Sequence, residues 1–141
     1  MNKMNENKKL GVSDYLNLYK KLKEGKKPSN EKSIRIALLS SFTINGIKEV
    51  LFVKCHGLGI NVEFYVGSYN QYFQEILDKN SVLYKFKPDL AILFIDTRSI
   101  FGNNYLLPYG MDDKQRKRFI EEKLQEIKSL IEKLKLNLRA K

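Results

Sequence analysis

Ser41 and Thr43 are the first residues of this sequence that could carry chemistry. They follow the apolar run 34–39, where a strand is expected to turn into a helix. A hydroxyl at such a turn can cap the helix or act as a nucleophile. A nucleophile also needs a base, and the only histidine, His56, is expected near the far end of that helix, roughly 15 Å away for about ten residues. We therefore take capping as the main interpretation and a catalytic Ser41 or Thr43 as the alternative.

A second polar segment, Asp96-Thr97-Arg98, directly follows the apolar run 90–95. Arginine presents a planar fork of donors that matches a carboxylate or a phosphate. Asp96 and Arg98 could therefore orient such a group on a substrate. They could equally pair with neighbouring groups and hold this part of the fold together, and the sequence leaves both interpretations open.

A third segment, Tyr69-Asn70-Gln71-Tyr72, combines two aromatic rings with two amides directly after Gly67 and Ser68. Amides at the junction of a loop and a helix commonly satisfy backbone groups. Tyrosines beside amides also suit a binding surface. We include Tyr69, Asn70 and Gln71 among the predicted binding residues.

Cys55 and His56 are the only cysteine and the only histidine. A structural zinc site usually takes four such ligands, so we predict no metal site within this chain. Cys55 shares helical spacing with Ile47 and Leu51, which favours a buried small side chain over a reactive thiol.

Hydrophobic periodicity predicts helices that alternate with strands. The expected elements are a helix at 14–23 capped by Ser13, a strand at 34–39, a helix at 45–56, a strand at 60–66, a short helix at 71–77, a loop to Pro88, a strand at 90–95, a further loop, and a long helix opened by Asp112 and Gln115. Strand–helix–strand units build a parallel sheet with helices on its faces. We predict a three-layer α/β/α fold, flavodoxin-like, with three strands in the order 2-1-3.

Ligands of such sheets bind beyond the carboxyl ends of the strands, where the strand order reverses. This rule brings the three polar segments to one edge of the sheet. The long helix carries an apolar stripe at steps of four and three, which we expect to pack on the sheet. The stripe consists of Ile120, Leu124, Ile127, Ile131, Leu134 and Leu138.

The net charge of +10 invites a nucleic-acid interpretation, but its distribution argues against it. Residues 1–35 carry ten basic and four acidic side chains, residues 36–110 carry six of each, and residues 111–141 carry ten and six. The charge thus lies in the flanks, where a solvated helix face explains it.

The longest apolar run, 90–95, is far shorter than the about 20 residues of a membrane span. The polar start MNKMNENKKL lacks the apolar stretch of a secretory signal, so we expect a cytoplasmic protein.

Three stretches of the sequence carry a resemblance to a known family: 36–43 (IALLSSFT), 62–78 (VEFYVGSYNQYFQEILD) and 81–89 (SVLYKFKPD). Together they resemble the N-terminal region of FkbH-like proteins, the subfamily IIIC phosphatases and acyltransferases of the haloacid-dehalogenase (HAD) superfamily. The resemblance covers about residues 12–138. It implies an SGNH-hydrolase-like α/β fold for this region.

In that family a HAD-type domain follows, which dephosphorylates a phosphoglyceryl substrate, holds the glyceryl group on a cysteine and passes it to an acyl carrier protein in polyketide-type pathways. The catalytic motif of that domain is Asp-x-Asp-x-Thr, which implies a bound Mg²⁺. Neither Asp96-Thr97-Arg98 nor Asp112-Asp113 matches this motif. The Gly-Asp-Ser block of active SGNH esterases is also replaced, here by Ser41-Phe42-Thr43. The resemblance therefore implies the truncated front part of such a protein, without cofactor.

We accordingly predict a frayed N-terminus at 1–11, a leading helix and linker at 12–30, and a partial SGNH-like domain at 31–141. The predicted role is non-catalytic recognition of an acyl carrier protein or of the protein's own HAD domain, with a homodimer as a further possibility. The alternatives are a degenerate SGNH-type hydrolase and a basic nucleic-acid-binding domain.

Overall fold

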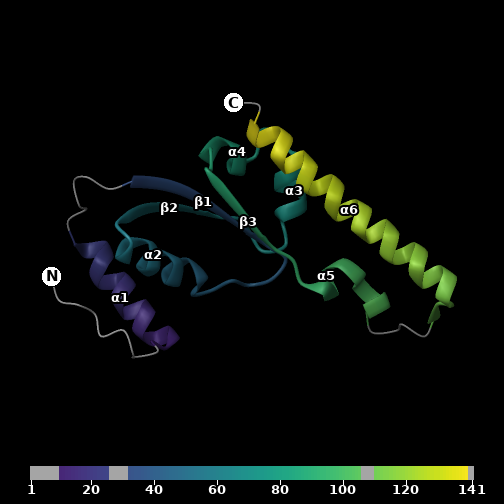
Figure 1. Ribbon diagram of the computed structural model, residues 1–141, viewed down its shortest axis with the longest axis horizontal. Coiled ribbons are helices and arrows are strands. Elements are labelled where there is room, and N and C mark those ends of the chain that lie inside the picture. Colours follow the sequence, from purple (N-terminus) through teal and green to yellow (C-terminus); the bar gives the residue numbers. More distant parts are fainter. Residues whose placement is uncertain (1–9, 26–31, 106–109, 140–141) are drawn as a thin grey trace. The chain divides into compact units, whose positions relative to one another are not determined.

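The computed structural model describes residues 10–25, 32–105 and 110–139 (Figure 1). Its elements are α1 (Val12–Glu24), β1 (Lys32–Ser40), α2 (Ile47–Gly57), β2 (Ile60–Val66), α3 (Tyr72–Leu77), α4 (Val82–Phe86), β3 (Leu90–Phe94), α5 (Thr97–Phe101), the 3-10 helix η1 (Gly102–Tyr105) and α6 (Asp113–Arg139). The chain forms two compact units, residues 1–34 with 44–63, and residues 35–43 with 64–141. The predicted frayed N-terminus and linker lie outside the described residues, apart from Leu10, Gly11 and the segment 12–25.

The sheet has the strand order β2-β1-β3. β1 pairs in parallel with β3, in a register that runs from Ile36 opposite Leu90 to Ser40 opposite Phe94. The central strand β1 is buried from Ile36 to Ser40, whereas β3 at the edge is only half-buried after an exposed Leu90. A strand with neighbours on both sides is less accessible to solvent than an edge strand, which explains the continuous apolar run in β1. The predicted α/β class and the order 2-1-3 are confirmed.

In the first unit α1 packs against α2, and the ring of Tyr19 meets that of Phe52 edge-on at a centroid distance of 5.0 Å. The predicted apolar face of α1 is half-buried as expected, at Tyr15, Leu18, Tyr19 and Leu22. The predicted cap was wrong. α1 begins at Val12 after Gly11, whose N–H donates to the carboxylate of Asp14 at 2.9 Å, so the acidic residue takes the role assigned to Ser13.

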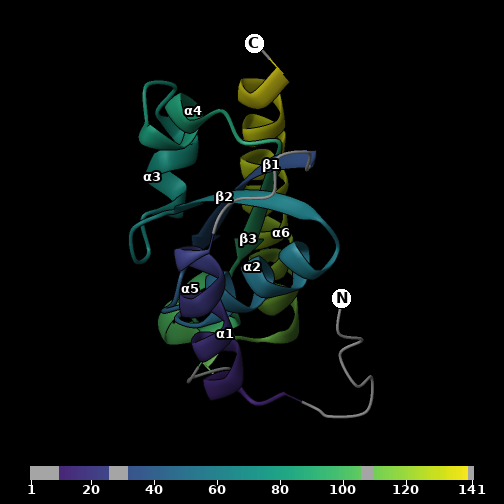
Figure 2. The ribbon, with the colours of Figure 1, turned by 90° about the vertical axis from the view of Figure 1, so that its left-hand side faces the viewer.

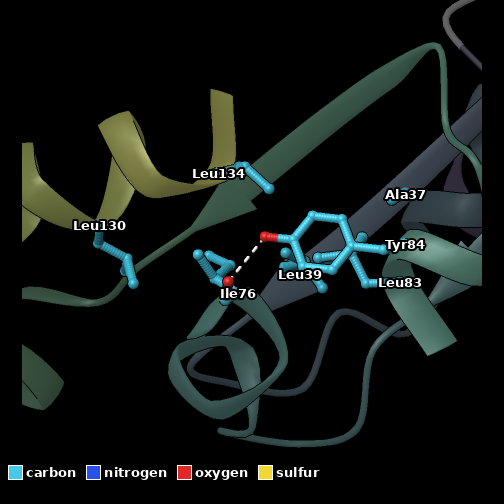
Figure 3. Close-up of a cluster of buried hydrophobic side chains, with 7 residues drawn as sticks. All are labelled: Ala37, Leu39, Ile76, Leu83, Tyr84, Leu130 and Leu134. Carbon is cyan, nitrogen blue, oxygen red and sulfur yellow. Dashed lines mark hydrogen bonds between the residues drawn. The ribbon is translucent and has the colours of Figure 1, made fainter. Parts of the chain in front are cut away.

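The core of the second unit joins β1 to three helices (Figure 3). α3 and α4 lie next to each other, as a quarter turn of the view also shows (Figure 2). The buried cluster consists of Ala37, Leu39, Ile76, Leu83, Tyr84, Leu130 and Leu134. At about 25 cal/mol per Å² of apolar surface removed from water, this burial is the main force that holds α3, α4 and α6 on the sheet.

A polar triangle is embedded in this cluster. The hydroxyl of Tyr84 donates to the carbonyl of Ile76 at 2.7 Å, a bond drawn in Figure 3. The amide of Asn137 donates to the same carbonyl at 3.3 Å and to the Tyr84 oxygen at 3.2 Å. These bonds pair the Tyr84 hydroxyl, the Ile76 carbonyl and the amide nitrogen of Asn137, which avoids the cost of leaving them unpaired in the core.

Three short helical segments lie where the sequence predicted loops. α4 occupies part of the predicted loop before Pro88, and α5 with η1 follows β3. Each is too short to show a helical period. Tertiary contacts stabilise α4, since Leu83 and Tyr84 are core residues and the hydroxyl of Ser81 donates to the Glu75 carbonyl at 2.8 Å.

The predicted start of α6 is confirmed by a reciprocal pair of hydrogen bonds. The N–H of Gln115 donates to the Asp112 carboxylate at 2.8 Å, and the N–H of Asp112 donates to the Gln115 side chain at 2.9 Å. The predicted packing of its whole stripe was wrong, because the buried face is centred on Leu130, Leu134 and Asn137. Exposed instead are three members of the stripe, Ile120, Leu124 and Ile131. Among the described helices, none combines the length and the apolar character needed to cross a membrane.

Candidate functional site

The three predicted polar segments do meet at one edge of the sheet, which we call the rim (residues 40–43, 67–71 and 96–98). The N–H of Ser41 donates to the Phe94 carbonyl at 3.0 Å, which joins the end of β1 to that of β3. On the other side, the N–H of Asn70 donates to the Ser40 carbonyl at 3.1 Å. The parallel strands dictate this arrangement, because their carboxyl ends share one edge.

Ser41 is the most enclosed hydroxyl of the rim. The residue is 2% exposed, and its Oγ accepts a hydrogen bond from the N–H of Asp96 at 2.9 Å. Its neighbour Ser40 closes a tight turn, since its Oγ donates to the Phe42 carbonyl at 2.6 Å and accepts from the Phe42 N–H at 3.0 Å. Both hydroxyls therefore satisfy backbone groups, as short polar side chains at turns commonly do.

The main interpretation of Ser41 and Thr43, that a hydroxyl caps the following helix, was wrong, because α2 has no side-chain cap. α2 begins only at Ile47, behind Gly46, which has a φ of +86° and no side chain to cap with. The Ser41 hydroxyl instead accepts a hydrogen bond from Asp96 in the turn after β3, and Thr43 is exposed. Glycine adopts this left-handed conformation without steric cost, so Gly46 suits the turn that leads into α2.

Asp96 and Arg98 form a closed pair at the start of α5. One carboxylate oxygen of Asp96 accepts the Arg98 backbone N–H at 3.1 Å, and the other lies 3.0 Å from both Nε and Nη2 of the guanidinium. The Asp96 carboxylate thus caps the helix and holds the arginine side chain, which is 71% exposed. This geometry fits the interpretation that the pair holds the rim together, and it leaves the outer part of the guanidinium facing solvent.

The segment 69–71 forms a tight turn whose side chains point outward. Asn70 has a φ of +54°, a conformation that asparagine tolerates better than most residues. The N–H of Gln71 donates to the Ser68 carbonyl at 3.1 Å, and Gln71 precedes α3 without capping it by its side chain. Tyr69 is 69% exposed, so an aromatic ring is the most prominent group that this part of the rim offers.

Glu75 is a rim-supporting residue that the sequence analysis missed. Its carboxylate accepts from the Tyr65 hydroxyl at 2.7 Å and from the Ser68 N–H at 3.3 Å. Burial, together with the hydrogen bond and the charge of Glu75, holds the pKa of the Tyr65 phenol well above its usual range. No pattern in the sequence pointed to Glu75. In the structure Gly67 leaves room for it, since a Cβ added there would lie 2.8 Å from the Leu39 side chain and 3.2 Å from the carboxylate.

An open groove of about 730 Å³ extends between α3 and α6. Phe73 and Leu77 form its apolar wall on α3 and are 45% and 47% exposed. From α6 it is lined by Glu122, Gln125, Glu126, Ser129, Leu130 and Lys133. Phe73 and Leu77 lie one helical turn apart on α3, and the exposed Tyr69 lies in the turn that precedes this helix. Sequence reasoning placed no site here, because the two walls are about fifty residues apart in the chain.

Within the described residues there is no group of three or more His, Cys, Asp or Glu side chains that could hold a metal ion. The carboxylates of Asp96 in the rim and of Glu75 beside it are each bound to groups of the protein itself. The rim therefore offers hydrogen-bonding and aromatic surface, and its polar atoms are arranged to join the strand ends.

A family model, that of the FkbH N-terminal domain, matches residues 35–140. The fold is similar to that of a crystal structure described as the N-terminal part of the protein BF1531 from Bacteroides fragilis, containing a phosphatase domain and complexed with Mg, with a TM-score of 0.66 and 21% sequence identity. The similarity covers 84% of this chain but 30% of that one, and at this identity it shows the fold alone. A search of the curated proteins gave no match.

Proposed function

This chain belongs to the FkbH N-terminal domain family, and from that premise we propose that it is the non-catalytic recognition and scaffold domain of an FkbH-like protein. The proposal assigns chemistry to a HAD-type phosphatase and acyltransferase domain of the same protein. It assigns to this chain the binding of an acyl carrier protein or of that catalytic domain.

The observation that carries the proposal is the structural role of the Ser41 hydroxyl, which is buried and bound to backbone. A nucleophilic hydroxyl must be reachable by substrate and needs a base that removes its proton. Ser41 is 2% exposed and accepts a hydrogen bond from the Asp96 N–H. His56, the only histidine of the sequence, lies in α2 next to the ring of Phe52. A buried hydroxyl that holds two strand ends together is typical of a structural residue.

The recognition surface in this proposal is the exposed part of the rim together with the groove. Tyr69 and Phe73 provide aromatic area, which commonly dominates binding energy at protein interfaces. The Asp96–Arg98 pair and the Glu75 network fix the loops that carry this surface, so binding would cost little ordering of the backbone.

The Mg²⁺ chemistry of the proposed whole protein does not fit the residues described here. Mg²⁺ is usually held by carboxylates together with substrate phosphate oxygens. Asp96 is paired with Arg98, and no cluster of three potential ligands exists among the described residues. No step that needs Mg²⁺ is therefore assigned to this chain.

An ester-hydrolysis assay tests the absence of catalysis. Wild type, the double variant Ser41→Ala with Thr43→Ala, and a control with Ser13→Ala and Ser99→Ala are compared on short-chain p-nitrophenyl esters. The control removes two exposed hydroxyls that lie outside the rim. We expect all three proteins to match the buffer rate. Turnover by wild type and control that disappears in the Ser41/Thr43 variant would refute the scaffold role and favour the degenerate hydrolase.

A binding assay tests the recognition role. A purified acyl carrier protein and a separately purified FkbH-like catalytic domain are each titrated against the full chain, and affinity is measured by calorimetry. For a partner that uses the rim and groove, we expect Tyr69→Ala with Phe73→Ala to weaken binding at least tenfold. This corresponds to a loss of about 1.4 kcal/mol of binding free energy. The control is Leu58→Ala, an apolar residue that is 77% exposed and belongs neither to the rim nor to the groove. Absence of binding to both partners would refute the role.

A further inference from the structure

α6 carries an exposed face on which lysines alternate with aliphatic side chains. Its members follow one another at steps of three or four residues, so they share one side of the helix. We call it the lysine–aliphatic face, made of Lys117, Ile120, Leu124, Lys128, Ile131 and Lys135. Ile120, Leu124 and Ile131 are 47%, 52% and 37% exposed, and the three lysines are exposed as well.

This face is distinct from the side of α6 that packs in the core. Burial on α6 is centred on Leu130, Leu134 and Asn137, and the groove to α3 lies along Gln125, Ser129 and Lys133. The core thus leaves the aliphatic members of the face uncovered in the described structure. Three exposed aliphatic residues along one helix face form the kind of patch that marks interaction sites.

The lysines of the face differ from three other basic residues of α6, which are held in ion pairs. Three basic residues of α6 are engaged with carboxylates in their own helix, in the pairs Arg116–Asp113, Arg118–Glu122 and Lys123–Glu126. Within the described part of the chain, no ion pair involves Lys117, Lys128 or Lys135. The face therefore presents three positive charges interleaved with apolar surface.

We infer that the lysine–aliphatic face docks an acidic amphipathic helix of a partner protein. The partner's apolar side chains pack on Leu124 and its neighbours, and its carboxylates lie against the lysines. Charge complementarity of this kind steers association and fixes the register of the two surfaces. The inference rests on the proposed recognition role and divides it between two surfaces. An acyl carrier protein, a class that is generally acidic, is assigned to this face, and the rim and groove are left to the catalytic domain.

Other occupants fit the face less well. Nucleic acid would match the lysines, but its phosphates offer nothing apolar to Leu124 and Ile131. An anionic membrane is a broad surface and would also meet the carboxylates of Glu121 and Glu132, which are exposed directly beside the face. A single partner helix, about 10 Å wide, is narrow enough to lie along the lysines alone. A second copy of the chain would bring two rows of lysines together, and like charges at close range oppose association.

Titration of a purified acyl carrier protein into the full chain at about 50 mM salt tests the inference. The first variant is Lys117→Ala/Lys128→Ala/Lys135→Ala, matched by the control Lys20→Ala/Lys79→Ala/Lys85→Ala, which removes the same charge from exposed lysines elsewhere. The second variant is Leu124→Ser/Ile131→Ser, with Leu136→Ser as control. We expect each face variant to weaken binding at least tenfold and each control less than twofold, with thermal melting showing that all variants are folded. Wild-type affinity should fall as salt rises, because screening weakens exposed charge pairs.

The outcomes separate this inference from the proposed function. Carrier binding that the face variants leave unchanged overturns the inference, and the recognition role stands. No carrier binding by wild type overturns the inference too, whereas the ester assay decides independently whether the domain is non-catalytic. Binding of duplex DNA or of vesicles with about 30% phosphatidylserine that depends on the lysines but not on Leu124 and Ile131 would assign the face to a polyanion. A dimer in sedimentation that Leu124→Ser/Ile131→Ser dissociates would assign it to a second copy.

Discussion

The two sides of α6 contain similar aliphatic residues in opposite surroundings. Leu130 and Leu134 are 4% and 7% exposed and belong to the core with α3 and α4, whereas Ile120 and Leu124 are 47% and 52% exposed. Both sets lie within one continuous helix that follows the same alternation of apolar and charged residues. The difference shows that periodicity identifies an amphipathic helix, while the neighbouring elements decide which of its apolar residues are buried.

Leu134→Ala gives the largest expected difference between the two sides. Removing a buried leucine side chain loses its transfer free energy and leaves a cavity, at a cost of about 2–5 kcal/mol in the free energy of unfolding. Leu124→Ala on the exposed side should change it by less than about 0.5 kcal/mol. Urea denaturation followed by circular dichroism measures both. Equal losses would mean that the exposed side is covered in solution, and would remove the basis of the comparison.

Asn137→Ala gives the next largest effect. Its amide donates to the Ile76 carbonyl and to the Tyr84 oxygen inside the core, so its loss leaves buried acceptors with one partner fewer. We expect a cost of about 1–3 kcal/mol. Gln125→Ala is the matched control, because that amide is exposed on the same helix. If both substitutions are neutral in urea denaturation, the buried triangle does not stabilise α6 on the core.

The sheet and its helices could be predicted because their signals are local. A continuous apolar run specified β1, and the pairing of Asp112 with Gln115 specified the start of α6. The side of α6 that is buried could not be predicted in this way. It depends on where Ile76 and Tyr84 lie, and these residues are more than forty positions away in the sequence.

The rim illustrates the same limit at the level of single atoms. The strand order placed Ser41 and Asp96 at one edge, as predicted. No pattern in the sequence shows that the Ser41 hydroxyl accepts the Asp96 N–H, because the two residues are 55 positions apart. The role of Glu75 was missed for a related reason, since its partners Tyr65 and Ser68 come close only once β2 leads into α3.

Asp112→Ala tests the exposed end of α6 and is expected to cost about 1 kcal/mol, the usual contribution of an N-cap. Its carboxylate satisfies the N–H of Gln115, one of the donors without a partner inside the helix. Asp112→Ser should restore most of the stability, because a hydroxyl can accept the same bond. Thermal melting compares the three proteins. The buried residues of α6 are Leu130, Leu134 and Asn137, all far from this end. A loss as large as that of Leu134→Ala would therefore contradict the assignment of the first turns to the exposed part of the helix.

Alkaline titration gives the smallest effect, which is absent at neutral pH. Burial raises the pKa of Tyr84 in the folded chain, and the hydrogen bond from Asn137 partly offsets this. The unfolded state loses the phenolic proton near pH 10, so above that pH it binds fewer protons than the folded state, and stability falls as pH rises. Tyr84→Phe should reduce this fall in the urea midpoint between about pH 9 and 11, and Leu124→Ala, on the exposed side of α6, should leave it unchanged. Asn137→Ala should make the fall steeper, because it removes the hydrogen bond that lowers the pKa of Tyr84. A shallower fall would show that the amide does not act on the Tyr84 phenol. The core side of α6 would then differ from the exposed side by apolar burial alone.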